Sequence, residues 1–332
     1  MKTLVVFSLL FCAAFAYSSN WASIEPAIVG GTEAPAHAYP FMASIHWVLN
    51  WPSPSSSHTC GGALISRRWV LTAAHCLTES PSLGRLDVLL GNHDHRFIEP
   101  GLTRVEVDRS VSILHPDWVP GKCEKFLNNF LELKSVTTCL WVIKNKFVKN
   151  IINNFVGMPC LNLCILLIFC LGGGVGPEDM ALLYMFDQVT YSPTVQAISL
   201  PPREHIPTGV GIAAGWGSTG PLGLTLPNTL QHAELQFIDI PTCRAQFDAA
   251  NLNGSLVDYT NVCTGGRPGG GLAVCSGDSG GPLFQRQGSG FVIQGVVSWG
   301  VVPCGSNNMP SGVFKRVSAY TDWIGDHTGL WP

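Results

Sequence analysis

Short segments in which apolar and polar residues alternate recur in both halves of this chain, with turn residues between them. These segments are 41–48, 62–65, 69–73, 86–90, 104–107, 211–214, 232–240, 282–285, 291–299 and 312–317. Short strands at such spacing favour an antiparallel sandwich or barrel over alternating strands and helices. The tail from 318 to 325 instead carries Tyr320, Trp323 and Ile324 at helical spacing, which predicts a C-terminal helix.

The composition narrows the class of protein. Charged residues make up 12% and hydrophobic residues 46%, with 36 Gly and 23 Pro. This mixture indicates a loop-rich, β-leaning globular protein and argues against a disordered chain. A formal net charge of -3 argues against nucleic acid as a partner.

The N-terminus has the organisation of a secretory signal peptide, which we assign to residues 1–16. Lys2 supplies the positive end, residues 4–15 the apolar core, and Ala14-Phe15-Ala16 the cleavage site. The core is shorter than the ~20 residues that span a membrane, so no membrane anchor is predicted. A secreted, extracellular protein is expected to form disulfides.

Three stretches carry residues suited to nucleophilic catalysis. Ser279 lies among glycines in the segment 275–283, and a serine hydroxyl needs a base to become a nucleophile. His75 ends the apolar segment 71–74 and can act as that base. Asp179 precedes the apolar segment 180–183, where a buried carboxylate requires hydrogen-bond donors.

Together these stretches resemble the chymotrypsin/trypsin family of serine endopeptidases, from residue 28 to about 325. The resemblance rests on Ile28-Val29-Gly30-Gly31, Thr72-Ala73-Ala74-His75-Cys76, Asp179-Met180-Ala181-Leu182-Leu183, Gly215-Trp216-Gly217, Gly277-Asp278-Ser279-Gly280-Gly281-Pro282 and Ser298-Trp299-Gly300. The chain order His, Asp, Ser is also that of the family. The resemblance implies an all-β fold of two antiparallel six-stranded β-barrels with a C-terminal helix, in a domain that spans 28–332.

The resemblance also implies a mechanism without cofactor or metal. Ser279 would attack the peptide carbonyl to give an acyl-enzyme, His75 would carry the proton, and Asp179 would orient His75. The backbone N–H groups of Gly277 and Ser279 would form the oxyanion hole. The alternative is a non-catalytic binding homologue of the same fold.

Activation is expected to involve Ile28 and Asp278. In the family, a freed amino group at the position of Ile28 pairs with the acid before the nucleophile, so residues 17–27 read as an activation peptide. A buried ammonium group needs such an anionic partner. Ala27 stands where family zymogens usually carry Arg or Lys, which argues against a trypsin-like activator.

The family's substrate pocket maps onto Ala273 at the floor, Gly300 and Gly312 at the walls, and Ser298 beside them. An uncharged, open pocket implies chymotrypsin-like selection of large apolar or aromatic side chains. The segments 301–303 and 309–311 depart from common patterns, so an elastase-like preference remains an alternative. The expected partners are protein and peptide substrates and protein protease inhibitors, and the expected state is a monomer.

Metal binding is not predicted. His93 and His95 could touch one metal, but no further ligand set accompanies them, so we interpret the pair as part of a solvated loop. Asn92 stands where calcium-binding relatives use a carboxylate, which predicts no calcium. The family's disulfide pairs would be Cys60–Cys76, Cys243–Cys263 and Cys275–Cys304.

The block 122–171 has a different composition. It holds six of the eight lysines and five cysteines, and it doubles the family's usual separation of His75 and Asp179. Codons for 121–123 can contain a splice-donor sequence and those for 168–172 an acceptor, so we hypothesise a translated, unspliced intron. A genuine surface-loop insertion is the alternative, because a longer loop costs little closure entropy.

Overall fold

The computed structural model describes residues 27–49, 55–81, 83–119 and 176–332. The predicted signal peptide, nearly all of the predicted activation peptide and the block 122–171 lie outside the described residues. The described part is built mainly of antiparallel strands, which confirms the predicted fold class. None of its helices is long and apolar enough to cross a membrane.

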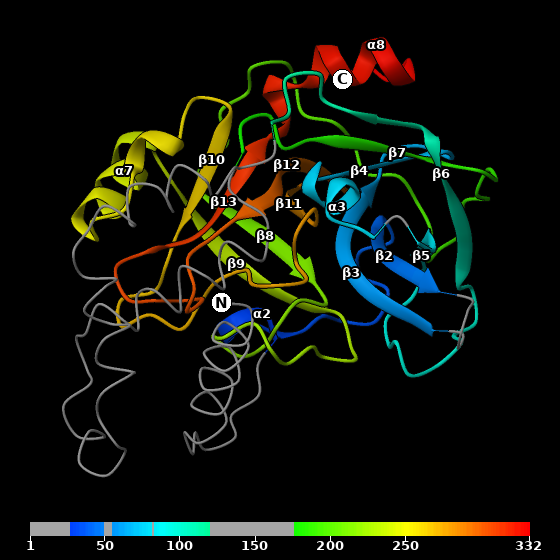
Figure 1. The fold of residues 1–332 in the computed structure, drawn as a ribbon, viewed down its shortest axis with the longest axis horizontal. Helices are drawn as coiled ribbons and strands as arrows, with labels where there is room; N and C mark the ends of the chain where they lie inside the picture. Colours follow the sequence, from blue (N-terminus) through cyan, green and yellow to red (C-terminus); the bar gives the residue numbers. More distant parts are fainter. Residues whose placement is uncertain (1–26, 50–54, 82, 120–175) are drawn as a thin grey trace, which may run out of the picture. The chain divides into compact units, whose positions relative to one another are not determined.

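The first barrel closes in the strand order β2-β3-β4-β7-β6-β5 (Figure 1). Its strands are β2 (Met42–Leu49), β3 (Ser55–Leu64), β4 (Trp69–Thr72), β5 (Arg85–Leu90), β6 (Thr103–Leu114) and β7 (Ala181–Met185). A short helix, α3 (His75–Thr78), follows β4. Alternate side chains point inward, so Ile45, Leu71 and Val88 are fully buried.

The second barrel contains six strands and one short addition. Its strands are β8 (Val210–Gly215), β9 (Gln231–Ile238), β10 (Asn261–Gly265), β11 (Pro282–Gln287), β12 (Gly290–Trp299) and β13 (Pro310–Arg316). The order β9-β10-β13-β12-β11-β8 is closed by pairing of β8 with β9, and β1 (Thr32–Glu33) adds to β9.

Helices are few and short. α7 (Ile240–Ala249) begins at Asp239, whose carboxylate accepts the Thr242 N–H at 2.7 Å and caps the helix. α8 (Thr321–Thr328) is the predicted C-terminal helix and ends at Gly329 with φ 73°. It begins three residues later than predicted, because Val317–Ala319 forms a separate 3₁₀ turn, η3. The other short elements are η2 (Gly254–Leu256) and α2 (Ala27–Gly30), which has non-helical dihedral angles at Ile28 and Val29.

Aromatic side chains join the two barrels. Phe41, directly before β2, meets Phe284 of β11 edge-to-face, with ring centroids 4.9 Å apart. Tyr39 and Phe291 extend this group. Such aromatic pairs contribute about 0.5–1.5 kcal/mol beyond burial, so they stabilise the relative placement of the barrels that the site depends on.

The described residues that flank the block 122–171 lie next to each other. A Cβ built on Gly176 would lie only 2.3 Å from the Val119 carbonyl oxygen and 2.5 Å from the Trp118 ring. A short connection between residues 119 and 176 is therefore compatible with the first barrel.

Candidate active site

Strand pairing brings His75 and Asp179 together. Thr72 of β4 pairs with Ala181 of β7, so the chain leaving β4 runs beside the chain entering β7. His75 Nδ1 lies 2.8 Å from Asp179 Oδ2, and the His75 backbone N–H donates to Asp179 Oδ1 at 2.9 Å. Ser298 Oγ of β12 donates to Asp179 Oδ2 at 2.6 Å. Three donors therefore hold a carboxylate that is 2% exposed.

This pairing sets the protonation of both groups. Burial tends to lower the pKa of His75, but the charge of Asp179 opposes it and the net pKa is raised. Burial tends to raise the pKa of Asp179, but His75 and Ser298 outweigh it and the net pKa is lowered. Asp179 therefore stays ionised at neutral pH and fixes the proton of neutral His75 on Nδ1, which leaves Nε2 as a base.

The turn that carries Ser279 lies against the same strand ends. The Gly61 N–H donates to the Ser279 carbonyl at 2.8 Å, and Cys76 Sγ lies 3.6 Å from that oxygen. Gly280 has φ 76°, and a Cβ there would lie 2.0 Å from Thr72 Oγ1, so only glycine allows this approach. No hydrogen bond joins Ser279 Oγ to His75 Nε2 among the described residues, an arrangement that is usual before substrate binds.

Within 277–281, two backbone N–H groups have no acceptor among the described residues. The N–H groups of Asp278, Gly280 and Gly281 donate to backbone carbonyls. Those of Gly277 and Ser279 have no acceptor among the described residues. Gly277 has φ 95° and donates nothing, while its carbonyl accepts from His58 Nε2 at 2.9 Å.

Asp278 is buried in the turn that carries Ser279. Its carboxylate accepts the N–H groups of Gly217 and Cys275, each at 2.9 Å, and the residue is 1% exposed. Burial outweighs these two hydrogen bonds and raises the pKa of Asp278 to about 7. No side-chain cation of the described residues pairs with it.

Ile28 lies in the same barrel. Its side chain is fully buried in a cluster with Ala213 of β8, and Asp278 lies against Gly215 of the same strand. Val29 forms a bridge with Ala273, whose N–H donates to the Val29 carbonyl at 3.0 Å.

The predicted pocket residues lie on adjoining segments of the second barrel. Trp299 pairs with Val313, which places Gly300 beside Gly312. A Cβ on Gly300 would meet nothing within 4 Å. At Gly312 it would lie 2.6 Å from Val274 Cγ2, so Val274 lines this space as well. Val274 was not predicted from the sequence as a pocket residue, although it directly follows Ala273.

A sequence model described as Trypsin matches residues 28–131 and 173–324. This match covers most of the chain and both barrels. The chain belongs to the trypsin family. The unmatched residues 132–172 lie almost entirely within the block 122–171.

A curated relative supports the assignment to the trypsin family. The chain is similar to serine proteinase stubble of Drosophila melanogaster, with 27% identity over 305 residues. The alignment covers 91% of this chain and 31% of the relative, so the chain spans about a third of the length of that protein.

The cysteines of this trypsin-family chain pair as the family resemblance implies. The described disulfides are Cys60–Cys76, Cys243–Cys263 and Cys275–Cys304. The first lies beside His75, and the third holds the segment after Ala273 against the segment after Gly300.

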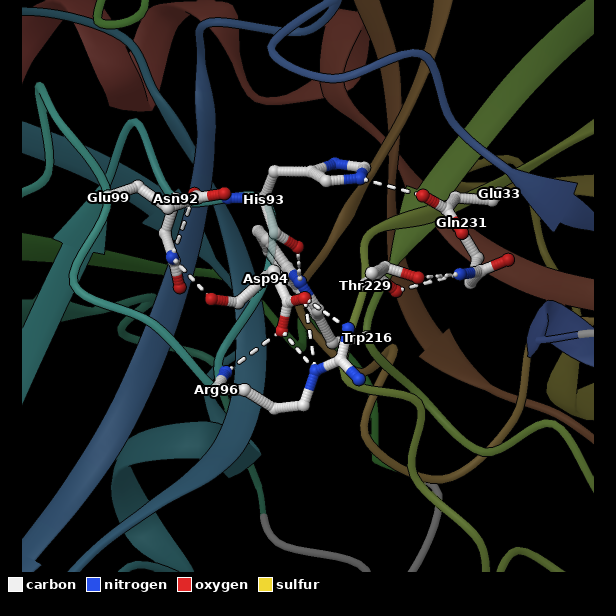
Figure 2. A network of polar contacts seen from close by, with 9 residues as sticks. All are labelled: Glu33, Asn92, His93, Asp94, Arg96, Glu99, Trp216, Thr229 and Gln231. Carbon is white, nitrogen blue, oxygen red and sulfur yellow. Dashed lines mark hydrogen bonds and ion pairs between the residues drawn. The ribbon is translucent and has the colours of Figure 1, made fainter.

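The interpretation of His93 and His95 as a solvated loop was wrong. His93 is only 7% exposed, and its Nε2 lies 3.1 Å from Glu33 (Figure 2). The loop is held inward because the Trp216 indole donates to the His93 carbonyl at 3.1 Å. The His95 ring stacks on Trp216 with centroids 4.9 Å apart.

Asn92 donates within this loop. Its amide reaches Glu99 Oε2 and the Asp94 carbonyl, each at 3.1 Å (Figure 2). An N–H donor faces these oxygens, whereas calcium binds oxygen ligands only. The absence of calcium stays a prediction.

Proposed function

We propose that this trypsin-family chain is a secreted, catalytically active serine endopeptidase that uses Ser279, His75 and Asp179. The observation that carries the proposal is the His75–Asp179 pair, 2.8 Å apart, next to a glycine turn in which the N–H groups of Gly277 and Ser279 have no acceptor among the described residues.

Each residue then has a defined role. His75 Nε2 takes the Ser279 proton as Oγ attacks the peptide carbonyl, and it returns that proton to the leaving amine. Asp179 stabilises the imidazolium, and Ser298 keeps Asp179 in place. The N–H groups of Gly277 and Ser279 bind the oxyanion, and each such donor contributes about 3–4 kcal/mol. Water then hydrolyses the acyl-enzyme.

We also propose that cleavage before Ile28 completes the site. A free Ile28 ammonium would supply the cation that buried Asp278 lacks, and Asp278 immediately precedes Ser279. Ile28 and Asp278 both contact β8, which supports their pairing. The residue before the cleavage point, Ala27, favours an activating protease that accepts small side chains.

The proposed preference is for large apolar or aromatic side chains before the cleaved bond. Ala273 and Val274 are uncharged, and Gly300 leaves one side open. An elastase-like preference is the alternative, because Val274 narrows the space beside Gly312. Ala273→Asp should shift cleavage toward Lys and Arg, since the new carboxylate would pair with a basic side chain.

Secretion is part of the proposal. The disulfides and the signal sequence support an extracellular protein that acts as a monomer on protein substrates and meets protein inhibitors.

The test is hydrolysis of a peptide library by protein that begins at Ile28, with Ser279→Ala as the matched control. We expect cleavage after apolar residues by the wild type and a loss of about 10⁶-fold in the variant. Equal, background rates for both would favour the non-catalytic homologue.

A further inference from the structure

Three histidine rings of the first barrel converge outside the proposed catalytic site. They are His46 in β2, His58 in β3 and His95 in the loop after β5. One nitrogen of each ring lies within 4.8 Å of the other two, and the ring centroids are 5.1–5.9 Å apart. A second cluster, Cys60, His75 and Cys76, offers no comparable set because its sulfur atoms form a disulfide.

The fold holds this cluster in place. Antiparallel pairing of β2 and β3 puts His46 opposite His58, next to a shift in register. The His95 backbone N–H donates to the Asn228 carbonyl at 2.9 Å, and the His95 ring stacks on Trp216. The flanking residues Asp94 and Arg96 pair with each other, as Figure 2 shows.

The hydrogen bonds of His58 suit a metal ligand. His58 Nε2 must donate to the Gly277 carbonyl at 2.9 Å, so Nδ1 carries the lone pair, which faces Ser44 Oγ at 2.7 Å. Metal-binding histidines usually donate their other N–H to a backbone carbonyl in this way.

His95 adds an independent sign of a missing partner. Its Nε2 is buried and has no hydrogen-bond partner among the described residues. Buried ring nitrogens are nearly always paired, and an unpaired one calls for a bound water or ion.

We infer that His46, His58 and His95 form a binding site for a transition-metal dication of the Zn²⁺ class. Neutral imidazoles suit Zn²⁺, Cu²⁺ and Ni²⁺, whereas Ca²⁺ and Mg²⁺ require oxygen ligands. The nearby carboxylates of Asp87 and Asp94 are paired with arginines, so three nitrogens and a water complete the coordination.

Binding requires the three ring nitrogens to move slightly closer together. Zn–N bonds of about 2.0–2.1 Å in tetrahedral geometry put the nitrogens ~3.4 Å apart. Side-chain rotation supplies that movement, and the metal replaces the Ser44 hydroxyl between His46 and His58. The ion would then link β2, β3 and the His95 loop, and through His58 it would contact the turn that contains Gly277.

The test uses the full chain carrying Ser279→Ala, without a polyhistidine tag, so that it does not depend on the proposed function. Zn²⁺ titration by calorimetry should give a micromolar or tighter site, and the thermal midpoint should rise with Zn²⁺. Adding His95→Gln should weaken binding by at least about tenfold. Adding His205→Gln, at an exposed histidine elsewhere, should leave binding unchanged.

X-ray absorption of the zinc-loaded Ser279→Ala protein supplies a second measurement that does not require the His95 variant to fold. Three imidazole ligands are expected. Equal affinity with and without His95→Gln, no binding below the millimolar range, or a zinc with fewer than two imidazoles would overturn the inference.

Discussion

Two buried aspartates of the candidate active site, one in each barrel, have opposite electrostatic surroundings. Asp179 belongs to the first barrel and has three donors, including His75, and its pKa is lowered. Asp278 belongs to the second barrel and has only two backbone donors, and its pKa is raised to about 7. The His75–Asp179 pair is therefore complete, whereas no side-chain cation of the described residues pairs with Asp278, beside Ser279.

Under the proposed function, this difference explains how cleavage before Ile28 would activate the protein. A carboxylate paired with a side chain is satisfied as soon as the chain folds. A carboxylate that requires a chain terminus is satisfied only after a peptide bond is cut, because an ammonium group at Ile28 exists only then.

The largest expected effect comes from replacing Asp179, whose side-chain partners are already in place. Asp179→Asn should lower kcat by about 10⁴-fold, because His75 then takes the wrong tautomer. The acid limb of kcat/KM should also move to lower pH, since Asp179 is what raises the pKa of His75 against burial. Steady-state kinetics across pH measure both effects. Asp187→Asn, at an exposed site, is the control, and equal losses in the two variants would contradict the account.

Before cleavage, the raised pKa of Asp278 should make the free energy of unfolding depend on pH. Because the pKa of folded Asp278 is raised to about 7, it keeps its proton to about that pH, whereas the carboxyl group of the unfolded chain loses its proton near 3.8, the ordinary pKa of an aspartate. The folded state therefore binds more protons in that window, and the free energy of unfolding falls as pH rises from about 4 to about 7. This contribution is on the order of 4 kcal/mol.

Urea unfolding of uncut Ser279→Ala protein, with and without Asp278→Asn, measures this contribution. The variant should lose the downward slope. Parallel pH profiles for the two proteins would show that the pKa of Asp278 is not raised in the folded protein.

Removing the acid should also uncouple activity from cleavage. We expect Asp278→Asn protein that begins at Ile28 to lose about 10²–10³-fold in kcat/KM, the cost of a displaced oxyanion donor. Peptide hydrolysis measures this loss, with exposed Asp326→Asn as the control. Activity equal to that of the control would exclude a role for the pair.

The smallest effect is expected from deleting 122–172. Val119 and Gly176 lie next to each other, so the first barrel and Asp179 need no long connection. The shortened protein should fold and match or exceed the full chain in activity. Loss of folding would favour a genuine insertion. A mature transcript that retains the segment in active secreted protein would end the intron hypothesis.

The sequence predicted those parts of the fold that have an alternating pattern. β2, β5, β8 and β12 were predicted to within one or two residues, because each is a largely apolar segment that is buried along most of its length. β10 was missed because Asn261 and Thr264 are buried polar residues. Their partners, such as Ser311 Oγ at 3.0 Å from Thr264 Oγ1, lie far away in the sequence.

Two other elements lack the expected pattern. The first residues of β3 are exposed serines, which become strand only because they pair with β2. In α7, only Cys243 and Phe247 are buried, which is too few to reveal a helical period.

The site could be predicted where motifs mark it and not where the fold assembles it. His75, Asp179 and Ser279 were predicted from local patterns. The contact of His58 with Gly277 spans the two barrels, and the cluster of His46, His58 and His95 joins two strands and a loop. No local pattern contains such sets, so only the three-dimensional structure could identify them.

The most direct test of the central claim is labelling of Ser279 by a fluorophosphonate, before and after cleavage between Ala27 and Ile28, with the labelled residue mapped by peptide mass spectrometry. The account predicts stoichiometric labelling of Ser279 in the cleaved protein and little in the uncut protein. No labelling after cleavage, or equally fast labelling of both forms, would contradict it.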